Sequence, residues 1–202
     1  MHMHTHTYTH THMHTHMHMH THTHMHMHTQ VLKSASALGE SFSSRHVREL
    51  HTLLALQPGA AKVDAHLGKL RELQQLEFHS EQLEYSFRSS LMRDVIYTSM
   101  TFENRKALHT AAADLLLQGP ADGRTTHTKY LAAYYHLRQA ENEPRVLCLT
   151  TDAAQQALLG TNWNDAIDVL ELGLDALEEA TYTRTLTLTL TLALTLTLTT
   201  DH

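Results

Sequence analysis

The sequence is poor in cysteine and has no excess of positive charge. Its single cysteine, Cys148, excludes an internal disulfide, which fits a reducing compartment, and we interpret it as a small buried apolar residue. The net charge is −6: residues 31–117 carry ten Lys/Arg and ten Asp/Glu, whereas residues 118–184 carry five and ten. Neither segment has the basic excess that binding to nucleic-acid phosphates requires, so we expect no nucleic-acid partner.

Segments that direct a chain to a membrane are also missing. The N-terminus lacks the basic and apolar regions of a secretory signal. No run reaches the roughly 18 consecutive apolar residues that a membrane-spanning helix needs. We therefore expect a soluble, cytoplasmic chain that makes no membrane contact.

Catalytic motifs are absent as well. The sequence contains no Gly-x-x-x-x-Gly-Lys-Ser/Thr phosphate loop, no His-Glu-x-x-His motif, no Cys-x-x-Cys pair and no Gly-x-Ser-x-Gly motif. We interpret His109 as structural or solvated, because no nucleophile is evident beside it. The pairs Arg93-Asp94 and Arg105-Lys106 are interpreted as solvated charges on helix faces. We expect a chain that is not an enzyme, with no catalytic, cofactor-binding or metal-binding residues and no cofactor.

A repetitive block opens the chain. Residues 1–29 consist almost wholly of His, Met and Thr and hold 13 of the 21 histidines. A plain CA dinucleotide repeat encodes alternating Thr and His in every reading frame, so we favour a translated microsatellite over a selected segment. The alternative is a metal-binding tail, because imidazoles at every second position would chelate a divalent metal, although adventitiously.

A second repetitive block, residues 184–202, alternates Thr and Leu. The period of two predicts an amphipathic strand, yet no partner strand is evident nearby, and leucine is also a good helix former. A lone strand with a leucine face would be an aggregation hazard. We assign this block no function, and we expect both tails to be disordered or poorly defined.

Between these blocks, apolar residues recur with the period of a helix. Gly39 and Pro58 separate the first helices, and Leu91 and Val95 fall near the apolar face of a later one. Three helices followed by a hairpin describe a winged helix, behind which two further helices pack. The predicted elements are helices over residues 31–38, 45–56 and 62–76, strands over residues 76–79 and 84–87, and two helices within residues 90–117.

The stretch from Phe87 to Leu117 resembles a pattern found in STAND-type signalling ATPases. The residues that carry this resemblance are Phe87, Arg88, Leu91, Arg93, Asp94, Tyr97, Met100, Arg105, Lys106, Leu108, His109 and Ala113. The start of the predicted winged helix also resembles that family, through Leu32, Lys33, Ala35, Ser36, Leu38, Gly39 and Phe42, as do residues 67–78. Ser89 departs from the pattern, because the family often has His there, so the resemblance carries over no contact of that histidine.

A turn-rich linker, residues 118–125, leads to three more predicted helices over residues 126–140, 145–159 and 163–180. Part of this region resembles a tetratricopeptide repeat, in which small residues let two helices approach closely. We interpret Trp163 as filling the core of that repeat. The resemblance is carried by Ala154, Leu158, Gly160, Trp163, Ala166, Ile167, Leu170, Gly173 and Leu174.

Together these patterns predict a mainly α fold. A winged-helix-like unit with a small β-hairpin, residues 30–117, precedes a tetratricopeptide-like superhelix, residues 126–183. The resemblance implies a non-catalytic regulatory or scaffolding fragment of a STAND-type ATPase from a parent similar to class III adenylyl or guanylyl cyclases. Its partners would be proteins or neighbouring domains. Two alternatives stay open: a STAND transcription regulator or sensor kinase as the parent, and a His-rich metal-binding protein.

Overall fold

The computed structural model describes residues 26–118, 126–160 and 162–200, with residues 183–200 described by their backbone alone. The chain divides into two compact units, Met1–Ala112 and Ala113–His202, which we call unit 1 and unit 2. The described residues are mainly helical and contain a small three-stranded antiparallel sheet, which confirms the predicted fold class. Within those residues no helix combines the length and the apolar character needed to cross a bilayer.

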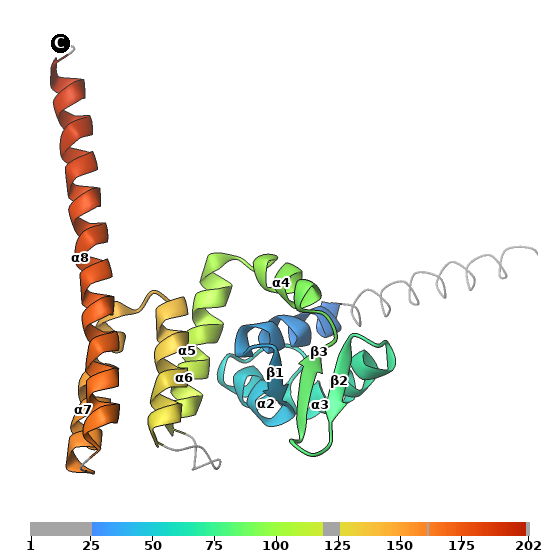
Figure 1. Ribbon diagram of the computed structural model, residues 1–202. Coiled ribbons are helices and arrows are strands. Elements are labelled where there is room, and N and C mark those ends of the chain that lie inside the picture. Colours follow the sequence, from blue (N-terminus) through green and yellow to red (C-terminus); the bar gives the residue numbers. More distant parts are fainter. Residues whose placement is uncertain (1–25, 119–125, 161, 201–202) are drawn as a thin grey trace, which may run out of the picture. The chain divides into compact units, whose positions relative to one another are not determined.

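Unit 1 has the order of elements predicted for a winged helix (Figure 1). In the sheet, β3 lies between β1 and β2, and Tyr85 of β3 is opposite both Phe42 and Phe78. The predicted hairpin is confirmed, whereas β1 was not predicted, because three residues with one apolar side chain show no alternation. The elements are a helix over residues 26–38, β1 (Ser41–Ser43), α2 (Ser44–Leu53), α3 (Ala60–Glu72), β2 (Leu76–His79), β3 (Glu84–Phe87) and α4 (Ser90–Thr98).

Helices α2 and α3 end earlier than their apolar spacing predicts. After these helices, Ala55 and Gln74 adopt the left-handed backbone conformation, with φ of 48° and 57°. The next amide then donates back to the last turn, as Gln75 N–H does to the carbonyl of Leu70 at 3.0 Å. This is the Schellman ending, which glycine usually provides. Since no glycine marks either end, the sequence carries no stop signal at these positions.

The core of unit 1 consists of large aliphatic and aromatic side chains. It joins the helix over residues 26–38 to α2, α3 and the sheet, and Phe42 stacks on Tyr85 with ring centroids 6.1 Å apart. Ile96 of α4 packs against the same cluster. The fully buried members are Val31, Leu32, Ala35, Phe42, Val47, Val63, Leu67, Leu70 and Leu76.

Helix α4 is the least buried element of unit 1. None of its residues is buried, and Leu91 and Val95, which the spacing places near one face of the helix, are exposed. Ser89, which stands where the resembled family often has His, caps α4 by accepting from the amide of Met92 at 3.3 Å. A short loop then leads to α5 (Phe102–Gln118), where the division between the units falls.

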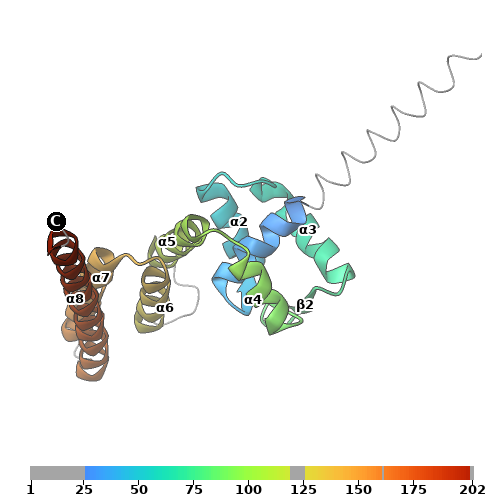
Figure 2. The ribbon, with the colours of Figure 1, turned by 90° about the horizontal axis from the view of Figure 1, so that it is seen from above.

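Unit 2 consists of helices in the part of the chain that the structure describes. The last turns of α5 are followed by α6 (Thr126–Gln139), α7 (Glu143–Leu159) and α8 (Trp163–Thr200). Both views show α6 beside α5 and α8 beside α7 (Figures 1 and 2). Asn142, which the sequence analysis did not single out, caps α7 by accepting from the amide of Arg145, and Gly160 ends this helix as predicted. The core consists of Ala113, Ala133, Leu137, Val146, Leu149 and Ala176, with Leu116, Tyr130 and Tyr134 packed against it.

The Thr/Leu block continues the last helix, which is one of the two structures that its sequence left open. α8 continues through Thr200, although the alternation over residues 185–199 has the period of a strand. A helix satisfies its backbone hydrogen bonds within one segment, whereas a strand needs a neighbour, and leucine favours the helix. Of the N-terminal block, residues 1–25 lie outside the described residues, as do residues 119–125 of the predicted linker.

Candidate interaction surface

Helix α8 turns its small residues inward. Ala166, Val169, Gly173 and Ala176 are buried, and their spacing of three and four residues places them on one face, which packs on α7. A Cβ atom placed on Gly173 would lie 2.9 Å from Oγ1 of Thr150 on α7, closer than a side chain tolerates. The small residues therefore allow a close approach of α7 and α8, as the resemblance to a tetratricopeptide repeat predicts.

The large apolar residues of α8 point away from the core. We call this set the α8 stripe, and its members are between 41% and 65% exposed. Their spacing alternates between four and three residues, so they form a continuous line along one side of the helix. Leu159, at the turn that precedes α8, is also exposed. The α8 stripe consists of Trp163, Ile167, Leu170, Leu174 and Leu177.

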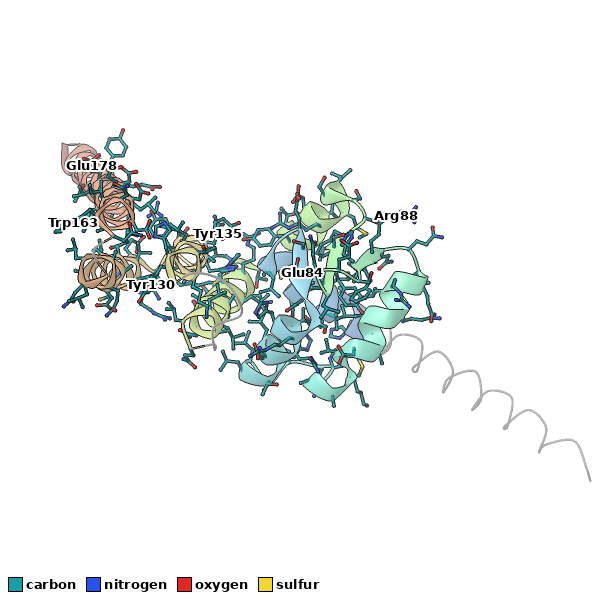
Figure 3. The ribbon with its side chains drawn as sticks, turned by 60° about the horizontal axis from the view of Figure 1, so that its bottom comes forward. Glu84, Arg88, Tyr130, Tyr135, Trp163 and Glu178 are labelled. Carbon is teal, nitrogen blue, oxygen red and sulfur yellow. The ribbon has the colours of Figure 1, made fainter. Side chains whose placement is uncertain are left out.

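An acidic edge runs along the α8 stripe. We give this name to Asp168, Glu171, Asp175 and Glu178, which lie roughly 60–140° around the helix from the centre of the stripe at 100° per residue. In the described residues, no lysine or arginine forms an ion pair with these four side chains, and residues 163–180 contain no basic residue at all. Figure 3 shows Trp163 and Glu178 on the side of α8 that faces away from α6.

The remaining acidic residues of this segment are engaged within unit 2. Glu179 forms an ion pair with Arg138 of α6, and Asp165 lies 3.8 Å from Nδ1 of His127. The hydroxyl of Tyr134 donates to the carbonyl of Leu172 at 3.1 Å, and burial raises the pKa of Tyr134. These contacts tie α6 to α8 and leave the acidic edge open to solvent.

Two predictions for unit 2 are wrong. Trp163 does not fill the core but is 65% exposed, because Ala166, Val169 and their neighbours occupy the inward face of α8. Cys148 is exposed rather than buried. On α7 the inward positions are taken by Val146 and Leu149, and the helical period turns Cys148 outward.

In unit 1, His109 is a buried residue that joins α4 to α5. Its Nε2 atom is hydrogen-bonded to the hydroxyl of Tyr97 at 2.8 Å, and the two rings meet edge to face with centroids 5.7 Å apart. This contact agrees with the structural interpretation of His109. It also explains locally why a tyrosine and a histidine stand twelve residues apart in the pattern that resembles the STAND family.

The basic residues near His109 are not solvated charges, which corrects the prediction. The guanidinium groups of Arg93 and Arg105 lie 5.6 and 5.4 Å from the ring centre of Tyr97, within cation–π range. Arg93 also donates to the carbonyl of Ser36 at 3.2 Å. The ammonium of Lys106 lies 5.7 Å from the ring centre of Phe102 on the same helix. The contact of Arg105 with Tyr97 joins α5 to α4, whereas the contacts of Arg93 with Tyr97 and of Lys106 with Phe102 each lie within one helix.

His51 is a buried histidine that the sequence did not single out. Its Nδ1 donates to the carbonyl of Pro58 at 2.8 Å, which leaves Nε2 without a proton and without a hydrogen-bond partner. Burial lowers the pKa of His51, against a smaller opposing contribution of the hydrogen bond to Pro58. Because the α2 periodicity marks only apolar positions, a histidine in the core gave no signal.

Two other candidate sites, one for a metal and one for a ligand, are less developed than the α8 stripe. His28 and His66 approach with their Nδ1 atoms 3.1 Å apart, so the end of the His-rich block contacts α3, but no group of three potential metal ligands occurs among the described residues. A hollow of about 230 Å³ lies beside Lys33, Met100 and Asn104. This volume is below the roughly 300–1,000 Å³ of pockets that enclose a drug-sized molecule.

The α8 stripe with its acidic edge is thus the most developed candidate site of the described chain. Comparisons with protein-family models, with curated proteins and with solved structures find no match for this chain.

Proposed function

We propose that the chain is a non-catalytic regulatory or scaffolding part of a STAND-type signalling ATPase, and that unit 2 is its protein-binding element. The parent we propose is similar to class III adenylyl or guanylyl cyclases, which places the chain in cyclic-nucleotide signalling. The observation that carries the protein-binding role is the α8 stripe, a continuous line of large apolar side chains left in solvent.

The energetic argument for binding follows from these exposed side chains. Burying a leucine, isoleucine or similar side chain contributes about 1.5–3 kcal/mol. Five such residues on one helical line offer a gain that scattered exposed leucines do not offer, and contiguous apolar patches mark interaction sites. A partner helix that packs along the stripe would gain this free energy through apolar residues spaced three and four positions apart.

The packing of unit 1 supports a structural role for the pattern on which the family resemblance rests. Tyr97 contacts His109, Arg93 and Arg105, and the contacts with His109 and Arg105 join α4 to α5. Their chemistry is used to hold two helices together. A regulatory unit requires such rigid packing, whereas a catalytic unit requires a group aimed at substrate.

The assignment to a STAND parent is tested by the coding sequence on both sides of the chain. Transcripts should carry, in the same frame and upstream, an ATPase core with a phosphate-binding loop and a cyclase domain. A kinase domain or a DNA-binding domain in the transcript would favour the alternative parents. A transcript that encodes neither an ATPase core nor any of these domains would contradict the proposal.

The absence of catalysis is tested on the purified chain. We expect no hydrolysis of ATP or GTP and no cyclic-nucleotide formation above the level of a His109→Ala variant, which serves as the matched control. Turnover that the variant loses while it stays folded would show that His109 acts in catalysis, and the non-catalytic role would then be wrong.

A further inference from the structure

We propose that the α8 stripe binds a basic amphipathic helix, whose apolar side chains cover the stripe and whose lysines and arginines pair with the acidic edge. This inference rests on the proposed role of unit 2 as a protein-binding element and goes further by naming the chemistry of the partner. It rests on two independent features of α8, which are the position of the large apolar side chains and the sign of the charges beside them.

The spacing of the large apolar side chains on α8 indicates that the partner is a helix. Ile167, Leu170, Leu174 and Leu177 follow one another by three, four and three residues, which is the repeat that packs helix against helix. The face of α8 about 100° around the helix from the stripe, on the side away from the acidic edge, is already occupied by α7 through Ala166 and its neighbours. One open line of large side chains therefore remains, and its width suits a single helix.

The acidic residues beside the stripe indicate that the partner carries positive charge. Asp168, Glu171, Asp175 and Glu178 stand along one side of the stripe without an ion pair in the described residues. A partner with acidic flanks would place like charges together, which costs free energy, whereas lysine and arginine at the flanking positions would pair across the boundary. Charge complementarity at such a rim gives specificity and speeds association.

A second copy of α8 does not meet this requirement. Residues 163–180 hold six acidic residues and no basic one, so the matching helix of another copy brings no cation to the acidic edge. The partner must therefore bring basic residues from a different segment.

The test is a titration of the full chain with a synthetic peptide as long as residues 163–180. The peptide has leucines at the spacing of the stripe, lysine and arginine beside them, and no aromatic residue. Trp163, the only tryptophan of the chain, lies at one end of the stripe and reports binding through a shift of its emission to shorter wavelength. We expect saturable binding that weakens as salt is added, because salt screens the charged rim.

Two peptide controls separate apolar contact from charge. A peptide with glutamate in place of the basic residues should bind about tenfold more weakly or worse, which corresponds to about 1.4 kcal/mol. A peptide of the same composition, but with the leucine spacing scrambled, should not bind.

Variants of the chain test the two features in turn. The double change Leu170→Glu and Leu174→Glu should abolish binding, and the milder Leu170→Ala and Leu174→Ala should weaken it. Leu91→Glu, on the exposed face of α4, is the matched control and should bind as the unchanged chain does. The triple change Glu171→Gln, Asp175→Asn and Glu178→Gln should remove the preference for the basic peptide. The same loss of charge at Glu40, Glu81 and Glu103, exposed residues of unit 1, should preserve it.

Three results would overturn the inference. The first is equal affinity for the basic and acidic peptides, and the second is no binding of either. The third is a dimer in sedimentation that the Leu170→Glu and Leu174→Glu variant dissociates, because the occupant would then be a second copy. Each of these results leaves the test of the STAND parent untouched, and a transcript without an ATPase core would leave the peptide titration untouched, so the two proposals fail separately.

Discussion

Unit 1 and unit 2 bury opposite kinds of side chain. The core of unit 1 is made of valine, leucine and phenylalanine, and its large aliphatic residues are almost completely removed from solvent. The buried residues of unit 2 are mostly alanines, and its large apolar residues on α8 lie at the surface. Since burial contributes free energy in proportion to apolar area, unit 1 gains far more per residue from its own core than unit 2 does.

This contrast comes from the residues that pack α7 against α8. Alanine and glycine let α7 and α8 approach closely, but they bring little apolar surface into the core. The larger apolar surface of this region belongs to Trp163 and the leucines of the α8 stripe, which stay exposed. Unit 1 therefore has the larger share of big apolar side chains in its core, whereas those of α8 in unit 2 lie mostly at the surface.

The largest effect is expected from removing a core side chain of unit 1. Leu67→Ala should cost about 2–5 kcal/mol of unfolding free energy, because the site is fully buried and leaves a cavity. Leu170→Ala on the α8 stripe should change stability by no more than about 0.5 kcal/mol. Urea unfolding, with hydrogen exchange to assign the loss to a unit, measures both. Equal costs for the two variants would contradict the contrast between the units.

A smaller loss is expected from crowding the contact between α7 and α8. Gly173→Ala should destabilise unit 2 by about 1–3 kcal/mol through overpacking against Thr150, less the roughly 1 kcal/mol that alanine gains over glycine in a helix. Adding Thr150→Ala should restore the stability. Hydrogen exchange of the α7 and α8 amides is the measurement, and a double variant as unstable as the single one would show that the clash is not the cause.

In each unit, we expect a gain in stability of similar size when glycine replaces a residue whose backbone has the left-handed conformation. Ala55→Gly in unit 1 and Glu141→Gly in unit 2 relieve positive φ angles of 48° and 49°. Each should stabilise its unit by roughly 1 kcal/mol, the cost of that conformation for a residue with a Cβ atom. Thermal unfolding followed by hydrogen exchange tests whether each gain stays within its own unit.

The smallest effect that we expect is a change in how the stability of unit 1 depends on pH. Because the folded pKa of His51 lies below its ordinary value of 6.5, the unfolded chain binds this proton more readily. The stability that His51 contributes is thus fully present above pH 6.5 and is lost as the pH falls through the folded pKa. His51→Gln, which can still donate to Pro58, should flatten the acid side of the unit 1 stability profile and leave unit 2 unchanged. An unaltered slope would mean that other histidines govern it.

Several elements could be predicted from the sequence because their signals are local. The hairpin from Leu76 to Phe87 follows from alternation and a polar turn, and the C-terminal end of α7 follows from Gly160. The ends of α2 and α3 could not be predicted in this way. They depend on Ala55 and Gln74 taking a conformation that their side chains disfavour, which the surrounding structure imposes.

The candidate site illustrates the same division. Helical period and residue type are properties of neighbouring positions, so the amphipathic helices and the acidic bias of the second half are already present in the printed chain. Which of two apolar faces of α8 is buried depends on what lies opposite each face, and that is settled when Gly173 meets Thr150 and the helices close together. Trp163 was misplaced for this reason, because a pattern identifies a face but does not identify its neighbour, whereas Cys148 was misplaced because its burial was inferred from its residue type alone.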